Sequence, residues 1–97
     1  MPTYIMLLNY TPKGMENIKA SPSRLDAAKQ AAQRLGGELK AYYLTMGQYD
    51  AIVIAEAPND EVVARFLLSI GAQGNVRTET LRAFTEDEYR KIIAGLP

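Results

Sequence analysis

The stretch TYIMLLNY, residues 3–10, decides how this chain folds, together with AIVIA at residues 51–55. Both stretches are nearly continuous runs of apolar or aromatic residues and have the length of one β-strand. Such a run, without polar alternation, predicts a strand that is covered on both faces. The two stretches are therefore expected to be central strands of one sheet.

Two amphipathic helices are predicted, each before or after one of these runs. The first begins at Ser21 as N-cap with Pro22 at the first helical position, and it ends at the glycine pair 36–37. The second follows Pro58 and has Asn59 as N-cap. The residues expected on their buried faces are Leu25, Ala28, Ala32 and Leu35 in the first helix, and Val63, Phe66, Leu67 and Ile70 in the second.

Two more polar segments complete the sheet. ELKAYYLTM at 38–46 and NVRTETLRAF at 75–84 read as edge strands, and TEDE at 85–88 is a capping box that starts a short final helix. The order is βαββαβ plus a C-terminal helix, which is the ferredoxin-like α+β pattern within a single domain, residues 1–97. In this topology the first and third strands are central, in agreement with the two apolar runs.

One face of this sheet has no cover from its own chain. The helices of a βαββαβ unit lie on one side, yet residues 4–8 and 51–55 leave no polar face on the two central strands. An apolar face of that size is unusual on a monomer. We therefore expect a homodimer that packs sheet against sheet, with possible further assembly into a tetramer or hexamer.

The amino-acid composition argues against several classes of function. The chain has no Cys and no His, so the usual thiolate and imidazole nucleophiles, bases and metal ligands are missing, and we expect no metal and no cofactor. Eleven acidic and eleven basic residues cancel, which argues against a nucleic-acid partner. No apolar run reaches the length of a membrane helix and no signal peptide is recognisable, so we expect no membrane partner and a cytoplasmic location.

The segment GQYD, residues 47–50, has two readings. Gly47 can supply a positive φ angle in a strand connection, and Asp50 can accept hydrogen bonds from nearby backbone amides. Alternatively, Tyr49 and Asp50 could act as an acid–base pair or bind a ligand. We favour the structural reading and keep both residues as ligand-binding candidates.

Three further residues are candidates for binding a small molecule. Asn9 ends a buried strand, where its amide could orient a ligand carbonyl or bond to backbone. Tyr43 could line a pocket together with Tyr10, Tyr42 and Tyr49, although tyrosines are more common around subunit interfaces. Arg82 lies five residues after Arg77, so the two should face opposite sides of a strand, and each is expected to form an ion pair at an interface, for example with Glu79 or Asp50.

The chain resembles the GYD-domain family, which comprises small bacterial and archaeal proteins. The resemblance rests on YIMLLNYTPKGMENIKASPSRLDAA at 4–28, GGELKAYYLTMGQYDAIVIAEAPND at 36–60 and GNVRTETLRAF at 74–84, and so spans nearly the whole chain. Ligand-sensing domains of the Lrp/AsnC type carry a similar GxYD turn and a similar VRTET strand. The resemblance implies a dimeric α+β barrel of ferredoxin-like subunits and implies little about activity.

Two function classes follow. The first is a non-enzymatic homo-oligomeric module that binds a small ligand or serves as a structural partner. The second is a cofactor-independent monooxygenase or isomerase acting on a small aromatic or polyketide-like compound. A filled space between sheet and helices would favour the structural role, whereas an apolar pocket with converging polar groups would favour a ligand or substrate.

Overall fold

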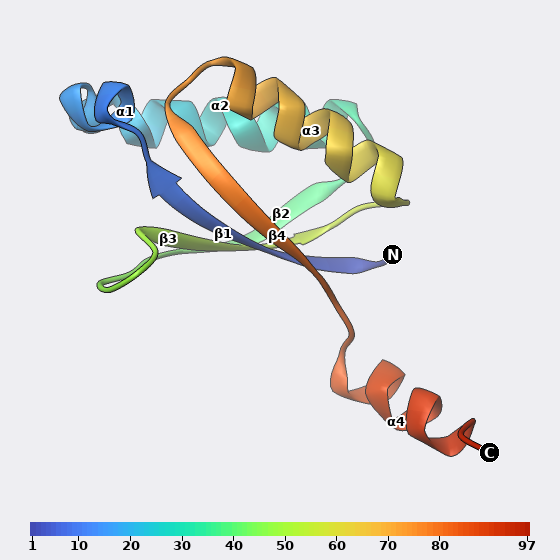
Figure 1. The fold of residues 1–97 in the computed structure, drawn as a ribbon. Helices are drawn as coiled ribbons and strands as arrows, with labels where there is room; N and C mark the ends of the chain where they lie inside the picture. The colour runs from blue at the N-terminus through green and yellow to red at the C-terminus, as the bar shows by residue number, and fades with distance from the viewer.

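A computed structural model describes all residues, 1–97 (Figure 1). The strands are β1 (Thr3–Tyr10), β2 (Glu38–Leu44), β3 (Ala51–Glu56) and β4 (Val76–Ala83), and the helices are α1 (Pro12–Glu16), the 3-10 turn η1 (Ile18–Ala20), α2 (Ser21–Arg34), α3 (Asp60–Ala72) and α4 (Glu86–Ala94).

The four strands form one antiparallel sheet in the order β2-β3-β1-β4. The central position of β1 and β3 confirms the prediction from their apolar sequences. The two more polar strands, β2 and β4, lie at the edges of the sheet. An edge strand has a neighbouring strand on one side only, so its outer row of backbone N–H and C=O groups is not paired within the sheet. This is the ferredoxin-like α+β fold.

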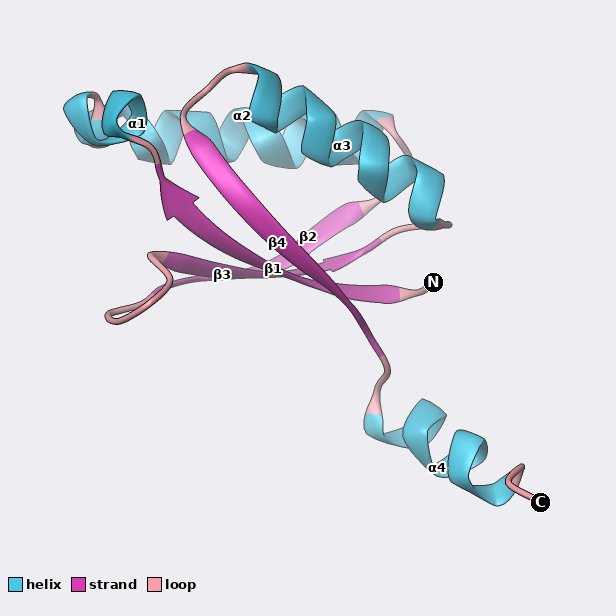
Figure 2. Cartoon of the chain, in the orientation of Figure 1, coloured by secondary structure: helices cyan, strands magenta, loops and turns pink.

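Helices α2 and α3 cover one face of the sheet, and the other face is open (Figure 2). The core lies between sheet and helices, where alternate residues of the central strands meet Ala32, Val63 and Phe66. The strand residues buried in this layer are Tyr4, Met6, Ala51, Val53 and Ala55. Only ten of the 97 residues are buried, so the chain alone encloses a small core.

The helix starts agree with the sequence except at one point. Asn59 Oδ1 accepts the Val62 amide at 3.0 Å, and the capping box of Thr85 and Glu88 is present. Ser21, predicted as an N-cap, is instead the first residue of α2. The prediction was wrong because η1 runs directly into α2, so Ala20 occupies the cap position and no side chain caps the helix.

Helix α4 lies beyond the end of β4, away from the sheet and the helix layer (Figure 1). The detached helix explains why the radius of gyration is 14.6 Å, whereas a compact domain of this length has about 12.5 Å. None of the helices has the length and apolarity needed to cross a membrane.

Candidate functional site

The turn between β2 and β3 is held by its own residues. Gly47 has a φ angle of 131°, in the region that favours glycine. Thr45 closes the turn, because its amide donates to Asp50 O at 2.9 Å and its hydroxyl donates to Tyr49 O at 2.6 Å. For this reason β2 ends at Leu44, two residues earlier than predicted.

Asp50 joins this turn to the end of β1. Its Oδ2 accepts a hydrogen bond from the Tyr10 amide at 2.9 Å, and its own amide donates to Leu8 O at 2.8 Å. The carboxylate thus serves a backbone amide that lies beyond the β1–β3 ladder. This is the contact that a structural role for Asp50 requires.

Tyr49 reaches from the turn to the opposite edge strand. Its hydroxyl donates a hydrogen bond to the Glu79 carboxylate on β4, and this bond raises the pKa of Tyr49 above its ordinary value. Glu79 lies opposite Leu7 in the β1–β4 register, on the open face of the sheet. The GQYD turn therefore extends over this face.

The open face is apolar along its centre. Because Tyr4, Met6, Ala51 and Val53 point into the core, the alternate residues point the other way. Together with residues of the edge strands they form a surface that we call the open-face patch, consisting of Ile5, Leu7, Ala41, Ile52, Ile54 and Leu81.

Helix α4 carries a second apolar surface. Tyr89, Ile92 and Ile93 of this helix and Leu96, which follows its C-cap Gly95, recur at helical spacing, and each keeps about half or more of its surface exposed. We call these four residues the α4 stripe. The α4 stripe does not pack against the core of its own chain, since the helix lies apart from the other elements.

The total exposed area is large for this chain. The surface is 6587 Å², whereas a compact monomer of this mass exposes about 5,500 Å². The excess of about 1,100 Å² is more than the roughly 800 Å² that each partner buries in a standard protein interface.

The remaining candidate residues do not form one site. Asn9 and Tyr43 are on the open face, opposite Arg77 and Ile52 respectively, and Tyr43 is 61% exposed. Arg82 is opposite Tyr4 and so belongs to the other face of the sheet.

Arg82 has aromatic and backbone partners within the chain. It stacks on the Tyr4 and Phe84 rings, with its guanidinium carbon 5.6 and 4.4 Å from their centroids, and it donates to Thr3 O at 3.2 Å. Arg77 and Arg82 do face opposite sides, as predicted from their spacing. Neither arginine forms an ion pair within the chain, and Glu79 is on the opposite face of the sheet from Arg82, so an ion pair of either arginine at an interface stays a prediction.

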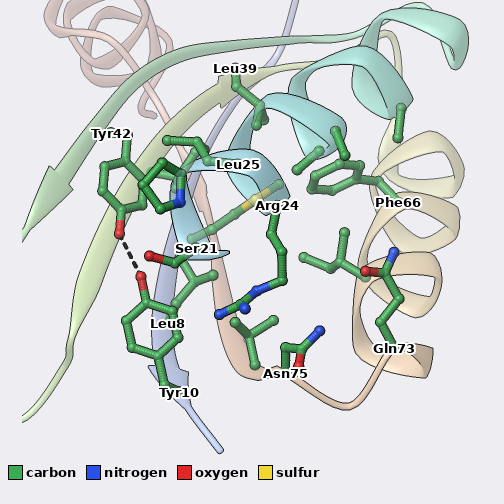
Figure 3. A pocket seen from close by; sticks show the side chains of 18 residues that line it. Leu8, Tyr10, Ser21, Arg24, Leu25, Leu39, Tyr42, Phe66, Gln73 and Asn75 are labelled. Carbon is green, nitrogen blue, oxygen red and sulfur yellow. Dashed lines mark hydrogen bonds between the residues drawn. The ribbon is translucent and has the colours of Figure 1, made fainter. Parts of the chain in front are cut away.

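A cavity of about 220 Å³ lies between the sheet and helices α2 and α3 (Figure 3). Pro22, Ala27 and Gln73 on its lining are exposed, so the cavity opens to solvent beside them. Its walls are mostly apolar, formed among others by Met6, Leu8, Leu25, Leu39, Val53 and Phe66.

Polar groups gather at one end of this cavity. The Tyr10 and Tyr42 hydroxyls form a hydrogen bond of 2.8 Å. Burial, followed by this bond, raises the pKa of Tyr42 to about 12. In the pair one hydroxyl donates to the other, which leaves one O–H free to donate to a ligand.

Arg24 is the only charged residue among those that line the cavity. Its guanidinium donates to Asn17 O at 2.8 Å and to Gly14 O at 3.3 Å, and no carboxylate lies within ion-pair distance. The cavity lining holds no carboxylate and no imidazole. These groups can bind and orient a ligand through the guanidinium of Arg24 and the hydroxyls of Tyr10 and Tyr42.

A close backbone approach shapes this end of the cavity. Gly14 in α1 is buried, and a Cβ there would lie 2.1 Å from Asn75 O. The contact sets α1 against the start of β4, beside Asn75 and Val76 of the cavity wall. Only glycine permits this approach, because any side chain would begin with a Cβ that collides with the Asn75 carbonyl.

Sequence reasoning found the cavity lining only in part. It names four tyrosines that could line a pocket and keeps Tyr43 and Tyr49 as ligand-binding candidates, yet the two that line the cavity are Tyr10 and Tyr42. It does not single out Arg24 either. The signal for Arg24 is a basic residue at helical spacing from Ala28 and Ala31, on the apolar face of α2.

Comparison with known proteins places the chain in a family. The GYD domain profile matches residues 4–93. The chain is 36% identical over 84 residues to the "Glutamine synthetase and cystathionine beta-lyase binding protein" of Thermus thermophilus, covering 86% of this chain and 88% of that protein.

Two crystal structures share the fold. FFRP-DM1 superposes with a TM-score of 0.61 at 20% identity, covering 87% of this chain and all of that one. TTHA0845 from Thermus thermophilus superposes with a TM-score of 0.56 at 24% identity, covering 88% and 95%. The profile match over nearly the whole chain and the similarity to the Thermus protein show that the chain belongs to the GYD-domain family.

Proposed function

We propose that the chain is a homo-oligomeric protein-binding module. The observation that carries this proposal is the excess exposed surface of the chain, together with two apolar surfaces that its own core does not cover, the open-face patch and the α4 stripe. Neither surface contributes to the chain's own core, and both are apolar. Burial of such surface in an interface stabilises association by roughly 25 cal/mol per Å² before the costs of ordering are subtracted.

A second copy of the chain is the occupant that fits the open face. Two twisted apolar sheet faces can pack in an aligned arrangement with two-fold symmetry. In such a dimer the α4 stripe of one copy would pack on the other copy, because α4 lies beyond the end of its own β4. The charge balance of the chain, which is zero, does not oppose self-association.

The name of the Thermus relative supports a further protein partner. That relative is named for binding glutamine synthetase and cystathionine beta-lyase, and it matches this chain over 86% of its length. We propose that this chain likewise binds a metabolic enzyme, in its assembled form. The alternative, a cofactor-independent monooxygenase or isomerase, gains no specific support from the groups that line the cavity.

Light scattering coupled to size exclusion tests the assembly. Wild type should elute at twice the chain mass or more, and Ile54→Glu should elute as a monomer because it places a charge at the centre of the open-face patch. The matched control is Leu68→Glu, at a leucine of α3 that is 74% exposed and outside both surfaces. A monomeric wild type would refute the proposal.

Binding to defined enzymes tests the partner. Glutamine synthetase and cystathionine beta-lyase from the same organism would be purified and titrated with wild type, Ile54→Glu and Leu68→Glu in a biosensor. We expect at least one enzyme to bind wild type and Leu68→Glu, and to bind Ile54→Glu more weakly. Absence of binding to both enzymes would contradict this part of the proposal while leaving the assembly result intact.

A further inference from the structure

The cavity between the sheet and helices α2 and α3 is separate from both association surfaces. It lies in the helix-covered layer, whereas the open-face patch is on the opposite side of the sheet. Self-association would therefore leave it accessible through the opening beside Ala27 and Gln73. We propose that this cavity binds a small organic carboxylate with an apolar, preferably aromatic, body.

The volume fits such a molecule. An apolar cavity of about 150 Å³ is known to accommodate benzene, and this one measures about 220 Å³. The difference leaves room for a short substituent on the ring. A ligand of this size would contact the apolar walls and keep one side toward the opening beside Ala27 and Gln73.

The cavity has two chemically different ends. In Figure 3 the polar groups of Tyr10, Arg24 and Asn75 lie toward one end, and Leu39 and Phe66 lie toward the other. The strand register agrees with this view. Tyr10 is opposite Val76 at one end of β1, whereas Leu39 is opposite Ala55, which pairs with Tyr4 near the other end.

The positive charge of Arg24 favours a negatively charged ligand. Two of its five N–H donors are used by the carbonyls of Gly14 and Asn17, which fix the guanidinium in place without neutralising it. Asp50 lies near this end, but its carboxylate is bound to the Tyr10 amide and does not line the cavity. A carboxylate could therefore accept two N–H donors from Arg24 and one O–H from the tyrosine pair.

Calorimetric titration with 3-phenylpropionate and its neutral isostere 3-phenylpropanamide tests the assignment. We expect the acid to bind at least about tenfold more tightly than the amide, since hydrogen bonds between a guanidinium and a carboxylate are stronger than those to a neutral amide. Equal affinities, or no binding of the acid at millimolar concentration, would overturn the proposal.

Three variants locate the site. Arg24→Gln should abolish the preference for the acid by weakening the acid more than the amide, whereas the matched control Arg34→Gln, on the exposed face of the same helix, should behave as wild type. Ala28→Leu should weaken both ligands by filling the cavity. A wild-type acid preference in Arg24→Gln would refute the role of Arg24.

A second measurement does not depend on any variant. Methyl resonances of Leu25, Val53 and Ile70, which line the cavity, should shift when 3-phenylpropionate is added to wild type. Shifts confined to Ile52 and Ile54 would place the ligand on the open face and overturn the proposal. Neither experiment depends on oligomerisation or on an enzyme partner.

Discussion

At the residue scale, Asp50 is the clearest structural element of the GQYD turn. Asp50→Ala would leave the Tyr10 amide without its acceptor, and we expect it to lower the free energy of unfolding by about 1–3 kcal/mol. Asp50→Asn should cost less, because the amide oxygen still accepts. Urea denaturation of wild type, Asp50→Ala and Asp50→Asn measures their free energies of unfolding.

Asp26→Ala is the matched control for the two Asp50 variants. Asp26 is exposed on α2 and has no hydrogen bond or ion pair, so its removal should leave stability unchanged or slightly raised by the better helix propensity of alanine. If Asp50→Ala melts at or above the wild-type temperature, the structural reading is wrong. Asp50 and Tyr49 would then become the first candidates for a chemical role.

The Tyr10–Tyr42 pair makes a second prediction at this scale. The pKa of Tyr42 is raised from 10.0 in an unfolded chain to about 12 in the folded one. A raised folded pKa contributes stability that is fully present below pH 10 and is lost as the pH rises toward 12. Tyr10→Phe removes the hydrogen bond and should lower the Tyr42 pKa.

Absorbance titration of phenolate formation measures this change. The titration of Tyr42 is obtained as the difference between each protein and the same protein carrying Tyr42→Phe. Because burial is the larger cause and persists in the variant, the pKa in Tyr10→Phe should fall but remain above the ordinary tyrosine value. A Tyr42 that ionises like a free tyrosine in wild type would contradict the buried pair.

At the scale of elements, α4 depends on its cap because it has no neighbours in its own chain. The hydrogen bond from the Thr85 backbone amide lowers the Glu88 pKa below its ordinary value. A lowered folded pKa gives stability that is present above the unfolded pKa and is lost as the pH falls through the folded one. Acid should therefore loosen the start of α4 before the rest of the fold.

Carboxyl-carbon NMR titration follows Glu88 directly. Thr85→Ala removes the hydroxyl that accepts the Glu88 amide at 3.2 Å, and the Glu88 pKa should rise toward the ordinary glutamate value. Helical chemical shifts at 86–89 should fall in the same variant. A Glu88 that titrates normally in wild type would show that the capping box does not form in solution.

At the scale of the whole molecule, stability should depend on concentration. A chain that completes its core by association gains stability from mass action. For two chains that unfold together, the melting temperature should rise by about 3–4 °C for each tenfold increase in concentration. Scanning calorimetry over two decades of concentration measures this.

Ile54→Glu provides the comparison for that experiment. The variant should melt at a lower temperature that no longer changes with concentration, because it unfolds as a single chain. Leu68→Glu should retain the wild-type dependence. A wild-type melting temperature that is constant across the range would argue that the open-face patch is not an interface.

The sequence determined the fold because local pattern and global topology agree. The unbroken apolar runs at 3–10 and 51–55 could only be central strands, and the spacing of Val63, Phe66 and Ile70 defined the buried side of α3. The caps at Asn59 and Thr85 are local interactions, so they were predictable. The start of α2 was not, since it depends on the preceding η1 turn.

Only the tertiary structure decided which candidate residues meet. Adjacent tyrosines in a strand point to opposite faces of the sheet. The register of the bulged β2–β3 pairing decides that Tyr42 faces the helices and Tyr43 the open side, and no local sequence pattern reveals that register. Arg24 reaches the cavity because the start of α2 lies beside α1, where its guanidinium donates to Asn17 O and Gly14 O, and Gly14 is required because α1 meets Asn75. Such contacts join residues distant in sequence, and they exist only once the chain is packed.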